Sequence, residues 1–192
     1  NTCAFIESAK KESIDNILDI AWLKKHHKLK GIVVTGCLAE RYQTDILREL
    51  PEVDALLGVG SIHKIVEAVG SVLENASKKG AKKQKYACFD DKETCDLEGE
   101  RVVTTGDNMA YIKIAEGCSN RCTYCAIPGI RGKPRARTMK ASIEEETALD
   151  ALGIKELNII AQDTSAYGID LYGKYELPEL IRGICSATDI PW

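Results

Sequence analysis

Residues 111–125 read Tyr-Ile-Lys-Ile-Ala-Glu-Gly-Cys-Ser-Asn-Arg-Cys-Thr-Tyr-Cys, a strand-like run followed by three closely spaced cysteines. The spacing Cys-x3-Cys-x2-Cys places the thiols of Cys118, Cys122 and Cys125 within eight residues, so that all three can reach one small inorganic centre. A structural zinc site needs four ligands, usually cysteines and histidines. Here no histidine follows the motif, and the next cysteine is Cys185. An iron–sulfur cluster held by three cysteines leaves one iron open to a small molecule. The pattern therefore favours such a cluster over a defective zinc site or three core cysteines.

The same stretch resembles the signature motif of the radical S-adenosylmethionine (SAM) enzymes, in which an aromatic residue, here Tyr124, precedes the last cysteine. The resemblance implies that Cys118, Cys122 and Cys125 hold a four-iron four-sulfur (4Fe-4S) cluster and that the amino and carboxylate groups of SAM chelate its fourth iron. In this family an electron from the cluster cleaves SAM, and the resulting 5′-deoxyadenosyl radical abstracts an unactivated hydrogen. The resemblance further implies that Tyr124 binds the cofactor by lying along the adenine of SAM.

The composition is that of an ordinary soluble protein. The chain has 192 residues, of which 44% are hydrophobic and 29% charged, and this length fits one large or two small domains. A net charge of −3 does not by itself require a nucleic-acid partner. No apolar run approaches the roughly 20 residues of a membrane span, and no signal peptide is visible. We therefore expect a cytoplasmic protein with no membrane partner, whose eight cysteines indicate metal ligation rather than disulfides.

Residues 1–75 alternate between helical and strand-like patterns. Short apolar runs at 32–35 and 54–57 lie between amphipathic segments, which is typical of buried parallel strands framed by helices. Ser61 is expected to cap the last of these helices. The inner faces predicted for the first and the last helix comprise Ile14, Ile17, Leu18, Ala21 and Trp22, and Ile62, Ile65, Val66 and Val69. The alternation predicts an α/β fold with a doubly wound parallel sheet.

Two further cysteines stand where such a sheet would bind a ligand. Cys37 follows strand 32–35, and Cys3 stands just before the first helix, where an upstream strand would end. Open α/β sheets bind ligands at the carboxyl ends of their strands, so the two thiols could share a metal centre there. The alternative is that both are buried small hydrophobic residues, as free cysteines commonly are.

The segments around these two cysteines resemble two of the three cysteine motifs in the N-terminal domain of the methylthiotransferases. The segments are Asn1-Thr2-Cys3 and Thr35-Gly36-Cys37-Leu38. The resemblance implies that residues 1–75 form this domain. It also implies that Cys3 and Cys37 ligate a second, auxiliary 4Fe-4S cluster, whose third cysteine lies upstream of residue 1.

Residues 76–109 are typical of a polar linker, basic in its first part and acidic in its second. Because the two blocks of charge offset one another, a solvated connector is favoured over a nucleic-acid patch. Cys88 and Cys95 lie in this segment without partners at useful spacing, and no role is assigned to them.

From residue 110 onward the strand and helix patterns resume. Strands are predicted at 111–115 and 157–161, with a helix between them that opens on the capping box Ser142-x-x-Glu145. Pro178 suits the first turn of a last helix. The buried face expected for that helix comprises Leu180, Ile181, Ile184 and Cys185. The resemblance to the radical SAM enzymes implies that residues 110–192 form the first part, about a third, of a partial (β/α)6 barrel.

Charged and polar side chains near the cysteine triplet are candidate cofactor contacts. Six cations and no acid lie between Gly117 and Ile143, which suits an anionic cluster and the SAM carboxylate, although a loop of this kind can also be merely solvated. Gln162 and Asp163 follow strand 157–161 at its carboxyl end, where barrels carry catalytic groups. We predict that both residues contact SAM or the substrate. The alternative for Asp163 is a helix cap.

Some motifs resemble one branch of the methylthiotransferases, the RimO type, more than the MiaB type. They include Ala161-Gln162-Asp163-Thr164 and Asp170-Leu171-Tyr172-Gly173. The resemblance implies the insertion of a methylthio group on the β-carbon of an aspartate in a small-subunit ribosomal protein, protein twelve of the small subunit. The alternatives are a MiaB-type enzyme, which modifies an adenosine in transfer RNA, and a non-catalytic iron–sulfur or zinc module.

The resemblance also implies partners. The enzyme would require a sulfur donor and an electron donor, would dock the ribosomal protein, and is expected to act as a monomer. Because the chain runs from Asn1 to Trp192, we expect it to lack the extreme N-terminus, most of the barrel and the C-terminal domain of this family, and to be inactive by itself.

Overall fold

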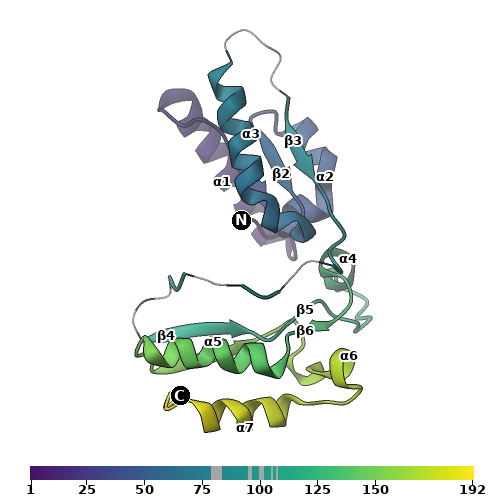
Figure 1. Cartoon of the computed structure of the whole chain (residues 1–192). Coiled ribbons are helices and arrows are strands. Elements are labelled where there is room, and N and C mark those ends of the chain that lie inside the picture. Colours follow the sequence, from purple (N-terminus) through teal and green to yellow (C-terminus); the bar gives the residue numbers. More distant parts are fainter. Residues whose placement is uncertain (79–83, 95–96, 100–101, 105, 107) are drawn as a thin grey trace. The chain divides into compact units, whose positions relative to one another are not determined.

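The computed structural model describes residues 1–78, 84–94, 97–99, 102–104, 106 and 108–192. The chain divides into two compact units (Figure 1). The first unit comprises Asn1–Cys95 and Cys122–Arg131, and the second comprises Asp96–Arg121 and Gly132–Trp192. The segment that carries Cys122 and Cys125 thus packs with the first unit, although it lies within the predicted barrel segment, residues 110–192.

The first unit is built on a parallel sheet of three short strands. These are β1 (Val33–Thr35), β2 (Ala55–Leu57) and β3 (Tyr86–Cys88), paired in that order. The register aligns Val33 with Ala55, and Ala55 with Tyr86. At the carboxyl end of β1, a parallel bridge joins Thr2 to Gly36.

Helices cover both faces of this sheet, which confirms the predicted parallel α/β architecture. On one face, α1 (Glu7–His26) and α2 (Cys37–Glu49) bury side chains against Val34 and Leu56. On the other face, α3 (Ile65–Ser77), which follows the 3₁₀ turn η1 (Val59–Lys64), packs Ala68 and Val72 against Ala55 and Leu57. Successive strand residues therefore alternate between two cores, as the pleat of a sheet requires.

The predicted inner faces of two helices were partly wrong. Ile17 is buried, but Leu18 and Trp22 of α1 are 46% and 57% exposed. The strands have only three residues each, so the sheet covers a short part of a long helix, and the other apolar residues stay at the surface. Ser61 does not cap α3: it lies within η1, and the helix begins at Ile65. The face of α3 that packs on the sheet carries Ala68 and Val72, and Val66 is 80% exposed.

The expected linker at residues 76–109 is not a connector throughout. Its residues Tyr86–Cys88 form β3, which pairs with β2 and completes the sheet of the first unit. An apolar run of three residues between long charged stretches carries too little periodicity to be recognised from sequence. Cys88 ends this strand, whereas Cys95 lies outside the described residues.

The second unit contains two parallel strands and two longer helices. Strand β4 (Met109–Lys113) pairs in parallel with β7 (Glu156–Ile160), and α5 (Met139–Ala151) lies between them in the chain and packs against α7 (Leu177–Ala187). A short antiparallel pair, β5 (Ala115–Glu116) with β6 (Arg135–Ala136), follows β4. The remaining short elements are α4 (Ile127–Arg131), which belongs to the first unit, and η2 (Thr164–Ala166) and α6 (Ile169–Tyr172) of the second. The larger hydrophobic cluster of the second unit contains the buried residues Ile112, Ile114, Tyr167, Leu180 and Ile184.

Local details of the second unit differ from the sequence predictions in two places. The N-cap of α5 is Thr138, whose Oγ1 accepts a hydrogen bond from Ala141 N at 3.2 Å, whereas Ser142 is buried inside the helix. Cys185 of α7 is exposed rather than part of the core. Pro178 does lie in the first turn of α7, as predicted. The parallel pair β4 and β7 agrees with one βα unit, and the (β/α)6 barrel itself stays a prediction.

Candidate functional site

Backbone hydrogen bonds bring the segments of Cys3 and Cys37 together at the carboxyl end of β1. Thr2 N donates to Thr35 O at 2.8 Å, and Cys37 N donates to Thr2 O at 2.9 Å. Gly36 makes this approach possible: its φ is +99°, and a Cβ there would lie 2.5 Å from Thr2 O. Cys37 is buried and Cys3 is exposed. The two predicted ligands therefore stand on neighbouring chain segments at the edge where open α/β sheets bind ligands.

Two neighbours hold these cysteines. Ser13 Oγ accepts from Cys3 N at 3.0 Å and donates to Cys3 O at 2.9 Å, which ties the Cys3 backbone to α1. Arg131 Nη2 donates to Cys37 Sγ at 3.1 Å. Thiolate or sulfide sulfur is a good acceptor for a guanidinium, so this surrounding suits an anionic sulfur centre.

The loop that carries Cys118 is fixed by a close contact between backbones. Gly117 has a φ of +80°, and a Cβ on it would lie 2.1 Å from Lys133 O. Cys118 N donates to Gly132 O at 3.1 Å, and Asn120 N donates to Cys118 Sγ at 3.4 Å. Cys118 is consequently held, and largely buried, directly after β5.

Cys122 and Cys125 lie on one turn in the first unit, where Cys125 N donates to Cys122 O at 3.0 Å. Cys122 is exposed and Cys125 half-buried, and the neighbouring Tyr124 is 86% exposed. Across the described residues, no three His, Cys, Asp or Glu side chains are grouped so as to hold a metal ion. Cys118 belongs to the second unit, whereas Cys122 and Cys125 belong to the first. The donor set, three thiols in a loop rich in cations, fits an iron–sulfur cluster.

Asp163 takes the role of a cap. Its Oδ1 accepts from Ser165 N at 3.1 Å and from Ser165 Oγ at 2.6 Å, so that Asp163 is the N-cap of η2. Its Oδ2 accepts from Asn120 Nδ2 at 2.7 Å. Hydrogen bonds from Ser165 and then from Asn120 lower the pKa of this carboxyl. Asp163 therefore connects the end of β7 with the cysteine loop, while Gln162 beside it is exposed.

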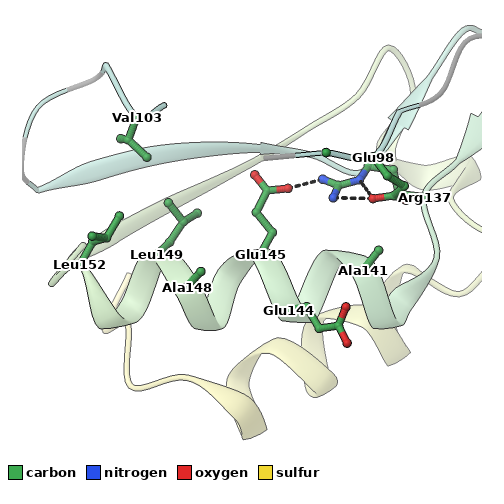
Figure 2. A pocket seen from close by; sticks show the side chains of 10 residues that line it. Glu98, Val103, Arg137, Ala141, Glu144, Glu145, Ala148, Leu149 and Leu152 are labelled. Atoms are coloured by element: carbon green, nitrogen blue, oxygen red, sulfur yellow. Dashed lines mark hydrogen bonds and ion pairs between the residues drawn. The ribbon is translucent and has the colours of Figure 1, made fainter. Parts of the chain in front are cut away.

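Arg137, one of the six cations between Gly117 and Ile143, forms ion pairs with acidic side chains. It is buried, its Nη2 lies 2.8 Å from Glu98 Oε2, and it also forms an ion pair with Glu145 of α5 (Figure 2). A pocket of about 560 Å³ is lined on one side by α5 and on the other by Glu98 and Val103 (Figure 2). Of the six cations counted between Gly117 and Ile143, Arg137 is therefore engaged with acids that lie outside the segment.

Glu146 is a buried acid that the sequence pattern did not reveal. Its side chain is fully buried in α5, and among the described residues neither of its carboxylate oxygens has a hydrogen-bond partner. Burial raises its pKa to about 8, the neighbouring Glu145 adds to this effect, and Arg137 opposes it. A single glutamate among three consecutive ones, Glu144 to Glu146, gives no signal of burial in the sequence.

Comparison with known proteins gives matches over the whole chain. Residues 1–58 match the uncharacterized protein family UPF0004. All 192 residues align with the ribosomal protein uS12 methylthiotransferase RimO of Lachnoclostridium phytofermentans at 48% identity and with that of Clostridium kluyveri at 46%. The protein of the same name from a Thermoanaerobacter species is 45% identical. The chain spans 42% of the length of each of these curated relatives.

These matches confirm the resemblance to the methylthiotransferases that the cysteine motifs indicated. Among the described residues, none of the helices combines the length and the apolar character needed to cross a membrane.

Proposed function

We propose that this chain is part of a RimO-type methylthiotransferase, which replaces a C–H bond on the β-carbon of an aspartate of ribosomal protein uS12 with C–S–CH3. The observation that carries the proposal is an identity of 45–48% over the entire chain to relatives with this name. The cysteine triplet in the sequence, and the segments of Cys3 and Cys37 that meet at the edge of the first sheet, support the same reading.

The proposed enzyme is cytoplasmic and monomeric, and it uses two 4Fe-4S clusters and SAM. Cys118, Cys122 and Cys125 would hold the SAM-binding cluster, and Cys3 and Cys37 would provide two of three ligands of the auxiliary cluster. When bound, these groups supply the sulfur, the methyl group and the carbon radical that removes the β-hydrogen of the aspartate. A sulfur donor and an electron donor would be the other partners.

The residues of this chain contribute position rather than reactive groups. Gly117 lets the backbone of the cysteine loop approach residues 132–133, so that Cys118 is held in one place. Asp163 holds the same loop through Asn120, and Asp163 and the exposed Gln162 are the candidate contacts to SAM or substrate at the end of β7. Tyr124, being exposed, is available to lie along the adenine of SAM.

Mass spectrometry of two cellular pools tests the proposed substrate. In cells that lack the full-length gene, the uS12 aspartate should lose a mass increment of about 46 Da, which corresponds to replacing H by SCH3. Complementation with the full-length gene should restore the increment, and complementation with its Cys118→Ala variant should not. Transfer RNA should keep its methylthio-adenosine in every strain.

Two outcomes would contradict the proposal. An unchanged ribosomal protein together with depleted methylthio-adenosine would assign the enzyme to the MiaB type. Stoichiometric zinc in the purified full-length protein in place of iron, with both pools unchanged, would indicate a non-catalytic module.

A further inference from the structure

The segment that follows the cysteine triplet packs against the helix that begins at Cys37. Helix α4, within the segment Cys122–Arg131, contacts α2 inside the first unit. Arg131 lies at the end of α4, and its Nη2 lies 3.1 Å from Cys37 Sγ. A residue 94 positions downstream of Cys37 is thus a hydrogen-bond donor to its sulfur.

A second contact holds α4 in this place. Lys92 Nζ donates to Gly129 O at 2.5 Å and lies 3.5 Å from Glu40 Oε1 of α2. Glu40 is buried, and its Oε2 accepts from Val59 N at 3.0 Å. The backbone from which the Arg131 side chain extends is therefore held against α2 by helix packing and by the Lys92 bridge.

The chemistry of this contact follows from charge. A guanidinium stays protonated at all physiological pH values and donates well to anionic sulfur. In iron–sulfur proteins, positive charge and hydrogen bonds near the ligand sulfurs favour the reduced, more negative state of the cluster. A cation in contact with Cys37 Sγ would consequently raise the reduction potential of a cluster bound there.

We propose that Arg131 is a positioning residue for the auxiliary cluster: it donates a hydrogen bond to the Cys37 sulfur and makes the reduction potential of that cluster more positive. This inference rests on the proposed function, because it requires a cluster at Cys3 and Cys37. The segment Cys122–Arg131 also carries Cys122 and Cys125, two of the three cysteines proposed as ligands of the SAM-binding cluster. The contact of Arg131 with Cys37 therefore links this segment to the proposed auxiliary site.

The test uses the full-length protein with Cys118, Cys122 and Cys125 changed to Ala, so that only the auxiliary cluster remains. The reduction potential is measured by redox titration followed by electron paramagnetic resonance. Arg131→Gln, which removes the charge, should shift the potential to a more negative value. Arg131→Lys, which keeps the charge, should shift it less. The matched control is Arg48→Gln at the far end of α2, an exposed arginine whose ion pairs are with Asp45 and Glu49, and it should leave the potential unchanged.

A spectroscopic readout distinguishes direct contact from a structural effect. In protein labelled with [15N]arginine, pulsed electron paramagnetic resonance of the reduced cluster should detect a nitrogen coupling that is lost in Arg131→Gln and kept in Arg48→Gln.

Each outcome decides between the two proposals. If the parent protein assembles no cluster that depends on Cys3 and Cys37, both the proposed function and this inference fail. If Arg131→Gln keeps the cluster at an unchanged potential, the inference alone is overturned. If Arg131→Gln assembles no cluster, the nitrogen coupling in the parent protein decides: its presence supports the role of Arg131, and its absence refutes it.

Discussion

At the scale of single residues, the buried carboxyl group of Glu146 makes the stability of the second unit depend on pH. Its pKa is about 8 in the folded chain, against an ordinary value of 4.5. As pH rises from about 4.5 to about 8, the unfolded chain therefore releases a proton that the folded chain keeps, and the free energy of unfolding falls. Above about pH 8 both states are ionised, and the loss is complete.

We therefore predict that Glu146→Gln stabilises the protein increasingly between pH 5 and pH 8. At pH 8 the gain should be on the order of 2 kcal/mol, because the amide has no charge to bury, although it still lacks a hydrogen-bond partner. Thermal unfolding of the full-length protein across this pH range measures the difference. Glu144→Gln, at an exposed position of the same helix, is the control and should give a difference close to zero at every pH. A pH-independent difference for Glu146→Gln would contradict the assigned pKa.

A second residue-scale prediction concerns the hydrogen bond between Asn120 and Asp163. Asp163→Ala removes the N-cap of η2 and the acceptor for Asn120, and should lower stability by about 1 kcal/mol. It should also reduce the iron bound by the triplet, because the loop between Cys118 and Cys122 loses its attachment to the end of β7. Iron analysis after anaerobic reconstitution of the full-length protein measures this.

Asn120→Ala should show the same loss of iron with intact η2 capping. The control is Asn158→Ala, whose amide pairs only locally with Glu156 in the described structure. Full iron occupancy in both Asn120→Ala and Asp163→Ala would show that this hydrogen bond does not position the loop.

At the scale of elements, the β5–β6 pair requires glycine at position 117. Glu116 pairs with Arg135, and the chain then turns at Gly117 with a φ of +80°. Gly117→Ala should cost about 2 kcal/mol, because the new methyl group meets Lys133 O and because the left-handed conformation disfavours alanine. The loss of the Cys118 N to Gly132 O hydrogen bond should accompany it. Thermal unfolding and amide hydrogen exchange at Cys118 measure the two effects.

The control for this element is Gly129→Ala in α4. An added Cβ there has no neighbouring atom within 4 Å, and no positive φ is involved. Helix propensity then favours alanine, so this variant should be neutral or slightly stabilising. Equal destabilisation by both substitutions would mean that the contact with Lys133 O is not the cause.

At the scale of the whole molecule, the two thiol sets should bind iron independently, because their ligands are separate. The full-length protein should hold about eight irons after reconstitution, and the combined change of Cys118, Cys122 and Cys125 to Ala should leave about four. Cys3→Ala or Cys37→Ala should stop sulfur insertion while SAM cleavage continues. Iron analysis and assays for 5′-deoxyadenosine and methylthio product measure these quantities. Loss of SAM cleavage in Cys37→Ala, with the protein still folded, would indicate that the two sites are not independent.

Much of the fold could be predicted from the sequence, because it depends on local patterns, and the cofactor chemistry stays a prediction that rests on such a pattern. The spacing of Cys118, Cys122 and Cys125 is a property of eight consecutive residues, and the alternation of buried runs with amphipathic helices is visible without any long-range contact. Predictions failed where the local pattern was ambiguous. Strand β3 is only three residues long. The serines Ser61 and Ser142 suit helix caps by residue type, but α3 has no side-chain cap and Thr138 caps α5.

Only the tertiary structure decided which side chains support the candidate site. Arg131 and Cys37 are 94 positions apart, Asn120 and Asp163 are 43 apart, and Arg137 and Glu98 are 39 apart. No periodicity or spacing rule links residues at such distances, because their contact depends on how whole elements pack. The sequence by itself thus predicted which thiols are candidate ligands, and the packing of α4 on α2 and of the cysteine loop beside the end of β7 decided which neighbours lie next to them.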